Sequence, residues 1–520
     1  MSSRLFLAFS ALLALGGLAN AQTSRTCAVQ GPTATPPSLG SRVSVEGVVT
    51  ATYRTGFFLQ DPNCDANAAT SDALWVDGRG SMLPPPIGNR ALVTGRVADD
   101  GGLTTIVAES VIDEGRYAGS VEAVRLSPPA EAAAAAAYLE SHEGMLVSLG
   151  ASRVVAATDE NGVAYLMPEA SGVTRIYPAD ADGRRIGVSL PDGWFAANQN
   201  DRLADAAGGL ADTPAGFAVW MRAGRVPIVE PGRGAPAAAA PAPAGQASLG
   251  TYDLDAFFDG VDDPAVDDAT SAARYPAELA LRAQSIARYV GSPDVLAVQE
   301  AESLGALQDL AAQPELIAAG YRAVLVDGAD PRGLDVGLLY REGRFTLRGF
   351  EARPAGGVAA RAPLVVQLQA AASGERLTVV ACDFETAATG PEAAAIRQVL
   401  SDHVRALVEE ARLADPGSGI AVLGHLVDAE DSAPLQRLMA GLLQNLNGRL
   451  PAERPYTTAV DGVSVAADYV LVDGVLAGRA TEARALHVNV DWAHRAPGAD
   501  PATSPRASDH DPVVVRLRTP

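Results

Sequence analysis

The chain has 520 residues, of which 48% are apolar, so it is long enough for two to four domains with cores of their own. Its formal net charge is −22, and it contains no lysine, so all 40 basic residues are arginine. This balance argues against a protein that grips nucleic acid through a broad basic surface, and any polyanion would need a local arginine patch or bound cations.

A secretory signal peptide is predicted over residues 1–21. A short charged start precedes an apolar run over residues 5–18, and Ala19-Asn20-Ala21 has the small-x-small form of a cleavage site. The run is too short to span a bilayer comfortably, and no later segment is long and apolar enough to do so. We therefore expect a secreted protein (periplasmic, cell-surface or extracellular) without a membrane span.

The three cysteines fall into two groups. Cys27 and Cys64 lie in the same N-terminal region, where they could form a disulfide in an oxidising compartment. Cys382 lies within an apolar run, which favours a buried free thiol.

Residues 22–116 are predicted to form a small closed β-barrel. Short strand-like runs separated by Gly, Pro and Asp clusters cover residues 43–50, 56–61, 73–77, 91–97 and 104–107.

This region also resembles the oligonucleotide/oligosaccharide-binding-fold (OB-fold) module that precedes the nuclease domain in bacterial extracellular nucleases. The resemblance rests on a Gly-Val-Val-Thr strand, on the run Gly-Phe-Phe-Leu-Gln-Asp over 56–61, and on a later Val-Thr-Gly-Arg-Val. Such folds can bind single strands by stacking bases on aromatic rings, for which Phe57, Phe58 and Trp75 are candidates. The alternative is that the rings fill the barrel, which we expect of at least two of them.

The middle of the chain is predicted to contain an accessory β-rich region over residues 117–230. An alanine-rich helix over 129–140 leads into a strand over 142–149, which resembles the strand that follows the barrel in the same nucleases. Residues 231–247 alternate Ala and Pro and cannot pack a core, so they are predicted to be an extended linker.

From residue 248 to 520 the pattern changes to strands that alternate with helices. Helices are predicted over 276–289 and 392–413, and buried strands over 294–299, 334–340, 364–368, 377–384, 420–423, 469–472 and 512–517. This alternation predicts an α/β (α+β) four-layer sandwich, two packed β-sheets flanked by helices, preceded by the all-β OB-fold-like module.

Acidic side chains and a histidine lie at the ends of these strands. Glu300 ends one strand, Asp468 begins another, and the pair Asp509-His510 precedes the last. Hard cations such as Mg²⁺ and Ca²⁺ prefer oxygen ligands, and an Asp-His pair can orient an imidazole to take a proton from water. These residues predict a divalent-cation site.

The order of the segments resembles the endonuclease/exonuclease/phosphatase (deoxyribonuclease I-like) family and, with the N-terminal module, its secreted bacterial nuclease branch. The most specific pieces are Gln299-Glu300 and residues 330–341, 468–472, 487–489 and 508–512. The resemblance implies metal-dependent hydrolysis of a phosphodiester in DNA or RNA by in-line attack of activated water. It also implies Mg²⁺, or Mn²⁺ or Ca²⁺, as cofactor.

The same resemblance implies roles for individual residues. Glu300 binds the metal, and the pair Asp509 and His510 activates water, with Asp509 also near the metal. Asp468 assists at the phosphate and the metal. Asp253 stands where the family has Asn, and an Asp can still bind a cation there.

Three further residues are weaker candidates. Asp335 lies near the place where the family has an acid partner for a second histidine. Arg397 and Arg341 could face the phosphate, although a surface or structural ion pair is the favoured role for both.

Three positions depart from the family. Its second histidine, which contacts the scissile phosphate, is Asp383 here; its Gly-Asp-Phe-Asn segment is residues 424–427, with His425 for Asp and Val427 for Asn. The exchange of His and Asp between two strands that the fold places side by side could preserve a mutual hydrogen bond. Losing one preorganised donor or base lowers a rate by a factor of about a hundred to ten thousand.

Three hypotheses therefore stand. The first is a secreted metal-dependent phosphodiesterase acting on DNA or RNA, with activity impaired by these substitutions. The second is a catalytically silent homologue retained to bind nucleic acid or a partner. The third is hydrolysis of another phosphate ester, with Asp253, Asp383 and Glu385 as added metal ligands.

Overall fold

The computed structural model describes residues 22–519 apart from 66, 181, 223–228, 262–268, 359, 387, 448–454 and 502–503. The predicted signal peptide, residues 1–21, lies outside the described residues. The chain divides into two compact units: the first holds residues up to 128 with 133–148 and 207–224, and the second holds 129–132, 149–206 and the chain from 225 onward. The predicted accessory region is thus shared between the units.

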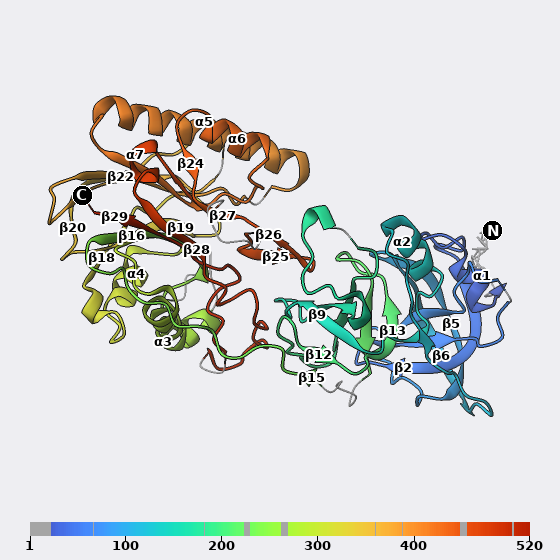
Figure 1. The fold of residues 1–520 in the computed structure, drawn as a ribbon. Helices are drawn as coiled ribbons and strands as arrows, with labels where there is room; N and C mark the ends of the chain where they lie inside the picture. Colours follow the sequence, from blue (N-terminus) through green and yellow to red (C-terminus); the bar gives the residue numbers. More distant parts are fainter. Residues whose placement is uncertain are drawn as a thin grey trace, which may run out of the picture. The chain divides into compact units, whose positions relative to one another are not determined.

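The first unit contains a closed ring of strands. Its elements are β1 (Gln22–Thr23), α1 (Thr26–Gln30), β2 (Arg42–Thr52), β3 (Gly56–Gln60), β4 (Ala73–Asp77), β5 (Asn89–Asp100) and β6 (Leu103–Arg116). They pair in the order β1-β2-β3-β4-β6-β5, and β2 also pairs with β5, which closes the ring (Figure 1). The predicted small closed barrel is therefore present, because the alternating apolar residues of each strand face one shared interior.

The remainder of the first unit is a short helix and four strands. These are β7 (Val124–Arg125), α2 (Ala132–Glu140), β8 (Leu146–Ser148), β13 (Ala207–Ala211) and β14 (Ala218–Met221), with the strands pairing in the order β7-β8-β13-β14. Cys27 and Cys64 form a disulfide in this unit.

In the second unit, a small sheet precedes the C-terminal domain. Its strands are β9 (Ser152–Ala156), β10 (Ala164–Pro168), β11 (Ile186–Ser189), β12 (Arg202–Leu203) and β15 (Val229–Glu230), with short turns η1 (Glu169–Ser171) and η2 (Pro178–Asp180). The strands pair in the order β15-β12-β9-β10-β11.

The buried carboxylate of Asp491 ties this small sheet to the C-terminal domain. It pairs with Arg175 and, at 2.7 Å, with Arg233, and it accepts a hydrogen bond of 3.0 Å from the Tyr456 hydroxyl. The Arg175 guanidinium lies 3.7 Å from the centre of the Tyr456 ring, whose other neighbour is the stacked imidazole of His487 at 3.7 Å. Arg175, within residues 149–206, is therefore joined to the C-terminal domain by a largely buried charge pair.

The C-terminal domain contains two six-stranded sheets and the helices around them. Its elements are β16 (Gln246–Phe257), α3 (Ala269–Gln284), η3 (Ser285–Val290), β17 (Val295–Ala301), α4 (Leu304–Ala311), η4 (Ile317–Ala319), β18 (Tyr321–Leu325), β19 (Asp335–Arg341), β20 (Phe345–Ala352), β21 (Leu364–Ala370), β22 (Arg376–Asp383), α5 (Gly390–Ala414), β23 (Gly419–His425), α6 (Ala433–Met439), β24 (Gln444–Asn445), β25 (Thr458–Val460), β26 (Val463–Val465), β27 (Asp468–Val472), α7 (Gly474–Ala477), β28 (Ala480–Ala485) and β29 (Val513–Arg518). The first sheet has the order β18-β19-β17-β16-β29-β28, and the second β20-β21-β22-β23-β27-β24.

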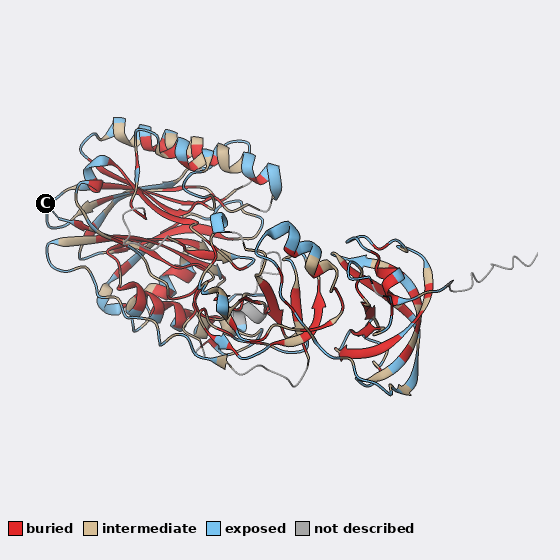
Figure 2. Ribbon diagram, turned by 45° about the vertical axis from the view of Figure 1, so that its right-hand side comes forward, coloured by how far each residue is buried: buried red, intermediate tan, exposed pale blue. Residues whose placement is uncertain are grey.

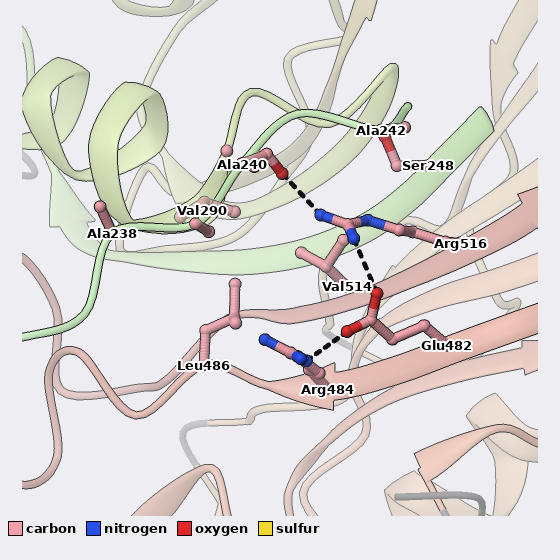
Figure 3. Close-up of a pocket in the computed structure, with 12 residues that line it drawn as sticks. Ala238, Ala240, Ala242, Ser248, Val290, Glu482, Arg484, Leu486, Val514 and Arg516 are labelled. Atoms are coloured by element: carbon pink, nitrogen blue, oxygen red, sulfur yellow. Dashed lines mark hydrogen bonds and ion pairs between the residues drawn. The ribbon is translucent and has the colours of Figure 1, made fainter. Parts of the chain in front are cut away.

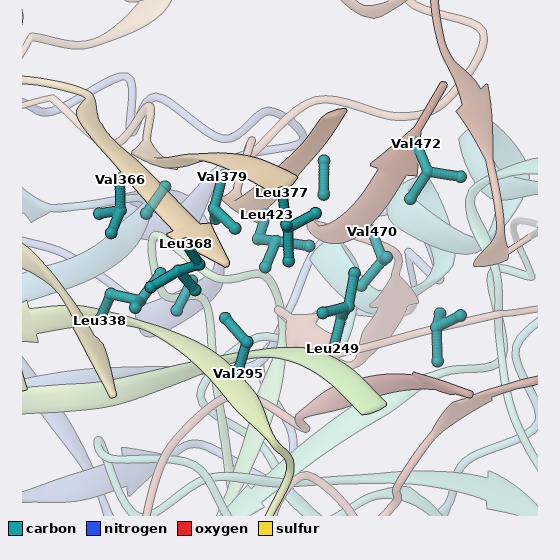
Figure 4. Packing of buried hydrophobic residues seen from close by; sticks show 14 of the residues in the cluster. Leu249, Val295, Leu338, Val366, Leu368, Leu377, Val379, Leu423, Val470 and Val472 are labelled. Atoms are coloured by element: carbon teal, nitrogen blue, oxygen red, sulfur yellow. The ribbon is translucent and has the colours of Figure 1, made fainter. Parts of the chain in front are cut away.

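The two sheets pack face to face. Leu249, Val295 and Leu338 of the first sheet meet Val366 and Leu423 of the second in one core, and Figure 4 shows these side chains pointing toward one another. The strands predicted from continuous apolar runs are therefore buried on both faces, as such runs require.

Helices cover the outer faces of both sheets. The helices α3 and α4 bury residues such as Leu279 and Leu307 against the first sheet, and α5 and α6 bury Leu400 and Leu435 against the second (Figure 1). Figure 2 shows the strands buried and the outward side of the long helix α5 exposed. The predicted four-layer arrangement is thus present in this domain, and Cys382 is a buried free thiol as predicted.

Part of the predicted linker is packed against the C-terminal domain. The Arg516 side chain donates a hydrogen bond of 2.6 Å to the Ala240 carbonyl and another of 2.8 Å to Glu482 (Figure 3). Ala238, Ala240 and Ala242 line a pocket with Val290 and Val514 of the domain. None of the candidate site residues lines this pocket.

Within the described part of the chain, no helix combines the length and the apolar character that a bilayer-spanning helix needs.

Candidate active site

The candidate residues meet at one edge of the two sheets because strand ends converge there. On the parallel strands β22 and β23, Asp383 lies opposite His425, and His425 in turn lies opposite Asp468 of β27. In the first sheet, Asp253 of β16 lies opposite Gln299 of β17, one residue before Glu300. Side chains from distant parts of the chain are thereby brought into one buried polar cluster.

The first part of this cluster, called the histidine half, consists of Asp253, His425, Asp468 and His510. The Nδ1 atom of His510 lies 2.7 Å from Oδ2 of Asp468, and both side chains are buried. Burial disfavours the charged imidazole, but Asp468 outweighs it and holds the pKa of His510 well above its usual value. Burial likewise opposes the charge of Asp468, yet His510 lowers the pKa of that carboxyl.

The partner of His510 differs from the prediction. The sequence pairs it with the adjacent Asp509, whereas the structure pairs it with Asp468. Asp509 and His510 lie in a bend before β29, and it is the Asp468 carboxylate at the start of β27 that bonds to the His510 ring. Asp509 is half-buried, and its Oδ1 atom lies 3.5 Å from the hydroxyl of Ser508.

His425 completes the histidine half. Its Nδ1 atom lies 3.6 Å from Oδ2 of Asp253 and 3.6 Å from Oδ1 of Asp383, and it has no hydrogen-bond partner. Its ring centre is 4.4 Å from that of His510. Burial opposes the charged form of His425, but the acidic neighbours outweigh it and raise its pKa to about 9.

The second part of the cluster, called the arginine half, consists of Glu300, Asp330, Arg361, Asp383 and Glu385. The Arg361 side chain is fully buried. It donates hydrogen bonds to Glu300 at 2.9 Å and to Asp330 at 2.8 Å, and a third to Asp383. The Oε2 atom of Glu385 lies 3.4 Å from Nη1 of Arg361. Burial alone would lower the pKa of Arg361, but these carboxylates raise it, so the guanidinium stays charged.

Glu300 is held in place on both of its oxygens. Oε1 accepts the bond from Arg361, and Oε2 accepts one of 2.8 Å from the backbone N–H of Ala256. Its backbone has a φ of 58°, which side-chain-bearing residues seldom adopt and which marks a strained position. Burial would raise the pKa of Glu300, but hydrogen bonding from Glu385 and the charge of Arg361 lower it to about 2.

The residues of the arginine half do not fit the predicted Mg²⁺ site. Oxygen atoms of Asp253, Glu300 and Asp383 lie within 4.8 Å of one another, a separation that would suit a hard cation. Two of these three carboxylates already bind the Arg361 guanidinium, however. The positive charge that a metal would supply at Glu300 is therefore supplied by the chain itself.

Other acids near the cluster are shifted by burial. Burial, and then the charge of Glu300, raise the pKa of Asp253 to about 7. Burial, and then its bond to Glu300, raise the pKa of Glu385 to about 7 as well. Burial, and then Asp509, raise the pKa of Asp255 to about 8. The cluster as a whole thus carries fewer negative charges at neutral pH than its sequence suggests.

The reciprocal exchange of His and Asp occurs where the sequence predicts it. Asp383 and His425 face each other on neighbouring strands, but their 3.6 Å separation is an ion-pair distance rather than a hydrogen bond. The carboxylate of Asp383 bonds to Arg361 instead. Val427, where the family has Asn, has a φ of 64°, which is unfavourable for a β-branched residue.

The weaker candidates lie outside the cluster. Asp335 accepts a hydrogen bond of 2.9 Å from the backbone N–H of Gly328. Arg397 pairs with Asp428 at 2.7 Å, which is the structural role favoured for it. Arg341, the last residue of β19, pairs with Asp294 at 3.4 Å, which is again the structural role favoured for it.

The aromatic rings proposed for base stacking are interior. Phe57, Phe58 and Trp75 have at most 4% of their surfaces exposed. Phe58 and Trp75 pack with Tyr53 and Trp220 in one aromatic group, while Phe57 faces the barrel core. Stacking on a base requires an exposed ring face, so the burial of all three rings agrees with the expectation that at least two of them are interior.

Arg361 and Asp330 belong to the cluster but are not predicted as site residues from the sequence. Arg361 is the one charged residue among small and apolar residues in the segment before β21, and this isolation is the sequence signal for it. Asp330 enters the prediction only as the first residue of the motif over residues 330–341.

Comparison with known proteins identifies the domain that carries this cluster. The Endonuclease/Exonuclease/phosphatase family matches residues 248–451, so the C-terminal half carries a domain of this family, as predicted. The match includes Asp253, Glu300, Asp383 and His425, whereas His510 lies beyond it. No curated protein matches the chain.

Several solved structures are similar to the chain. Humanized D. rerio TDP2 is 15% identical, with 53% of this chain and 100% of that chain covered and a TM-score of 0.38. The human Nocturnin catalytic domain is 16% identical, with 53% and 95% covered and a TM-score of 0.37. A family protein from Bacteroides thetaiotaomicron is 15% identical, with 52% and 97% covered and a TM-score of 0.39.

Proposed function

We propose that the protein is a secreted nuclease-family phosphodiesterase whose hydrolysis of DNA or RNA is impaired. The observation that carries this proposal is the buried Arg361 guanidinium, which binds Glu300 and Asp383 where the family would hold its metal. A divalent ion at Glu300 would have to displace a cation that four carboxylates stabilise.

The protonation of His510 supports the same proposal. A general base must be neutral to accept a proton from water, and it works best when its pKa lies near the working pH. Burial opposes the charged ring, but the Asp468 carboxylate outweighs it and holds the pKa of His510 well above its usual value, which favours the protonated imidazole. His510 and Asp468 are arranged like a general base and the acid that orients it, but the raised pKa of His510 favours a ring that already carries the proton.

The substitutions remove further contributions to catalysis. Val427 cannot donate the hydrogen bond that an Asn donates to a phosphate, and Asp383, which is bonded to Arg361, cannot supply the contact to the phosphate that the family's histidine makes. Each such loss lowers a rate by about 10²–10⁴-fold, and losses at one site do not simply multiply.

A catalytically silent homologue is the second candidate. It is favoured by the complete internal neutralisation of Asp383, whose side chain has no exposed surface and bonds to Arg361. In that case the domain would bind nucleic acid or another partner without cleaving it. The third hypothesis, with Asp383 and Glu385 as added metal ligands, is not favoured, because both lie against the same guanidinium.

Secretion and the OB-fold-like character of the barrel are parts of this proposal. The disulfide between Cys27 and Cys64 supports an oxidising compartment. The closed ring with parallel pairing of β4 and β6 supports an OB-fold-like module. The mass of the protein recovered from the host medium tests secretion, because cleavage after Ala21 leaves Gln22 as its first residue.

The experiment for the central proposal is a cleavage assay with plasmid, single-stranded DNA and RNA in Mg²⁺, Mn²⁺ and Ca²⁺. The wild-type chain is compared with Glu300→Ala and with the triple variant His425→Asp, Val427→Asn, Asp383→His, which restores the family residues. We expect slow or absent cleavage by the wild type, and cleavage faster by about 10²-fold or more in the triple variant.

Two outcomes would contradict the proposal. Fast Mg²⁺-dependent cleavage by the wild type that Glu300→Ala abolishes would mean that a metal displaces Arg361 readily. A folded triple variant that stays inert would mean that the three positions do not limit the reaction.

A further inference from the structure

The histidine half contains a set of metal-binding atoms that differs from the set the family resemblance implies. Asp253 comes from β16, His425 from the end of β23, and His510 from the loop before β29. One ligand atom from each of these three side chains lies within 4.8 Å of the other two. All three side chains are more than nine-tenths buried.

The imidazole of His425 has an unused nitrogen directed into this set. Its Nδ1 atom is buried, lacks a hydrogen-bond partner and lies 3.6 Å from Oδ2 of Asp253. Buried polar atoms without partners are rare in folded proteins and call for an explanation such as a bound ion. A metal between this nitrogen and the carboxylate would satisfy both.

The imidazole of His510 is already oriented for binding a metal. Its Nδ1 atom faces Oδ2 of Asp468 at 2.7 Å, so Nδ1–H donates to that carboxylate, and loss of the Nε2 proton on metal binding frees Nε2 for a ligand bond. Metal-binding histidines commonly donate their other N–H to a carboxylate in this way, which fixes the ring and raises its basicity. Asp468 is therefore a positioning residue for His510.

The two rings lie close together. Their centres are 4.4 Å apart, so one ion can take a nitrogen ligand from each ring and an oxygen from the carboxylate. Bonds of about 2.0–2.2 Å need the three ligand atoms to approach one another more closely than 4.8 Å, which side-chain rotation can provide.

We propose that Asp253, His425 and His510 bind one divalent transition-metal ion of the Zn²⁺ or Co²⁺ class. The site is distinct from the Mg²⁺ position at Glu300, which Arg361 fills. Imidazole nitrogen suits Zn²⁺, Co²⁺ and Ni²⁺, whereas Mg²⁺ and Ca²⁺ prefer oxygen. The replacement of the family's Asp by His425 thus changes the class of metal that this edge selects. This inference is independent of whether the protein hydrolyses a phosphodiester.

Titration of the full chain, free of any histidine tag, with Co²⁺ tests the site without an activity assay. Co²⁺ bound to nitrogen ligands in a low-coordinate site absorbs visible light, so we expect a visible band that saturates at one ion per chain. Zn²⁺ should abolish the band at equal concentration, and a large excess of Mg²⁺ should leave it unchanged.

Variants locate the ion. His425→Ala should lose the band, with Co²⁺ affinity lower by more than about 100-fold, and Asp468→Asn should weaken it by about 10–100-fold through the orientation of His510. His142→Ala is the matched control, because this imidazole lies in the other unit and bonds to the Tyr138 carbonyl. It should bind Co²⁺ like the wild type.

Each alternative result decides against the site. No band in the wild type, displacement of Co²⁺ by Mg²⁺, or an unchanged band in His425→Ala would overturn the proposal. Circular dichroism checks the folding of each variant. If His425→Ala does not fold, His425→Asp takes its place, since it restores the acid of the family and should also lose the band.

Discussion

The two halves of the polar cluster differ in how they balance their acids. In the arginine half, a permanent cation on a single side chain binds three carboxylates and lies beside a fourth. In the histidine half, the cations are two imidazoles that can lose their charge. An arginine does not lose its proton, and a metal does not easily replace it, whereas an imidazole can exchange its proton for a metal. The difference explains why we place metal binding in one half and not in the other.

The largest effect is expected from Arg361→Ala. Removing this cation leaves Asp383 and its neighbours buried without a partner, which destabilises a protein by about 3–5 kcal/mol. Mg²⁺ or Ca²⁺ should restore part of the melting temperature in the variant but have little effect on the wild type. Calorimetry with and without the ions measures this.

A surface arginine provides the control for that variant. Arg353 pairs with Glu351 and Glu410 in an exposed position, so Arg353→Ala should change the melting temperature little. Equal stabilisation of the wild type and Arg361→Ala by Mg²⁺ would show that the guanidinium does not block the metal.

The next effect is expected from Asp468→Asn, which breaks the carboxylate–imidazole pair of the histidine half. Losing this buried ionic hydrogen bond should lower the free energy of unfolding by about 1–3 kcal/mol. The folded pKa of His510 is raised, so its contribution is complete below pH 6.5 and is lost as the pH rises through the folded value. The folded pKa of Asp468 is lowered, so its contribution is present above pH 3.8 and is lost as the pH falls through the folded value.

The stability difference between wild type and Asp468→Asn should therefore be greatest between pH 3.8 and 6.5. Denaturant unfolding across this range measures it. A difference that does not vary with pH would mean that the two groups are not charged together in the folded protein.

Glu143 shows what a buried carboxyl does when neither cation is near. It lies fully buried in the first unit, with Oε1 bonded to the Thr104 N–H at 2.7 Å and Oε2 without a partner. Burial raises its pKa to about 8 from 4.5, so stability should fall as the pH rises from 4.5 to 8.

The side chain of the variant Glu143→Gln does not titrate. At neutral pH the free energy of unfolding of this variant should exceed that of the wild type by about 1–2 kcal/mol, and its melting temperature should be higher. Its advantage should vanish below pH 4.5. An equal advantage at pH 4 would place the effect in packing rather than in charge.

The smallest effect is expected at Val427. Its φ of 64° disfavours a β-branched residue, and Asn tolerates this conformation, so Val427→Asn should relieve strain of about 1 kcal/mol and offset the lost apolar packing. Val427→Ala loses the packing but keeps a Cβ in the same strained conformation, so it should melt at a lower temperature than Val427→Asn. The reverse order would mean that packing dominates at this position.

The strands of the C-terminal domain could be predicted because their apolar runs are buried on both faces. The run that ends at Asp383 sends Val379 and Ala381 into the core between the sheets and Val380 and Cys382 toward the helices. Such a strand has no polar face, so its sequence is a continuous apolar run that can be recognised directly. The positions of Glu300, Asp383 and Asp468 at one edge follow from those strand ends.

The pairings within the site could not be predicted, because they depend on side-chain direction and on loops. Asp509 is next to His510 in the chain, but the residue that bonds to the His510 ring is Asp468, which lies 42 residues away in the sequence. Arg361 lies 61 residues from Glu300, in a loop without a motif. The burial of Phe58 could be expected from the sequence, but its packing on Trp220 could not, since Trp220 comes from far later in the chain.

The most direct test of the account is an anomalous difference map from crystals of the full chain grown or soaked with Mn²⁺, which can take both oxygen and nitrogen ligands. The account predicts a peak among Asp253, His425 and His510, no peak between Glu300 and Asp383, and an Arg361 side chain that still bridges those two acids. A peak beside Glu300 with Arg361 displaced would contradict it, because the arginine would then be a replaceable occupant of a working metal site.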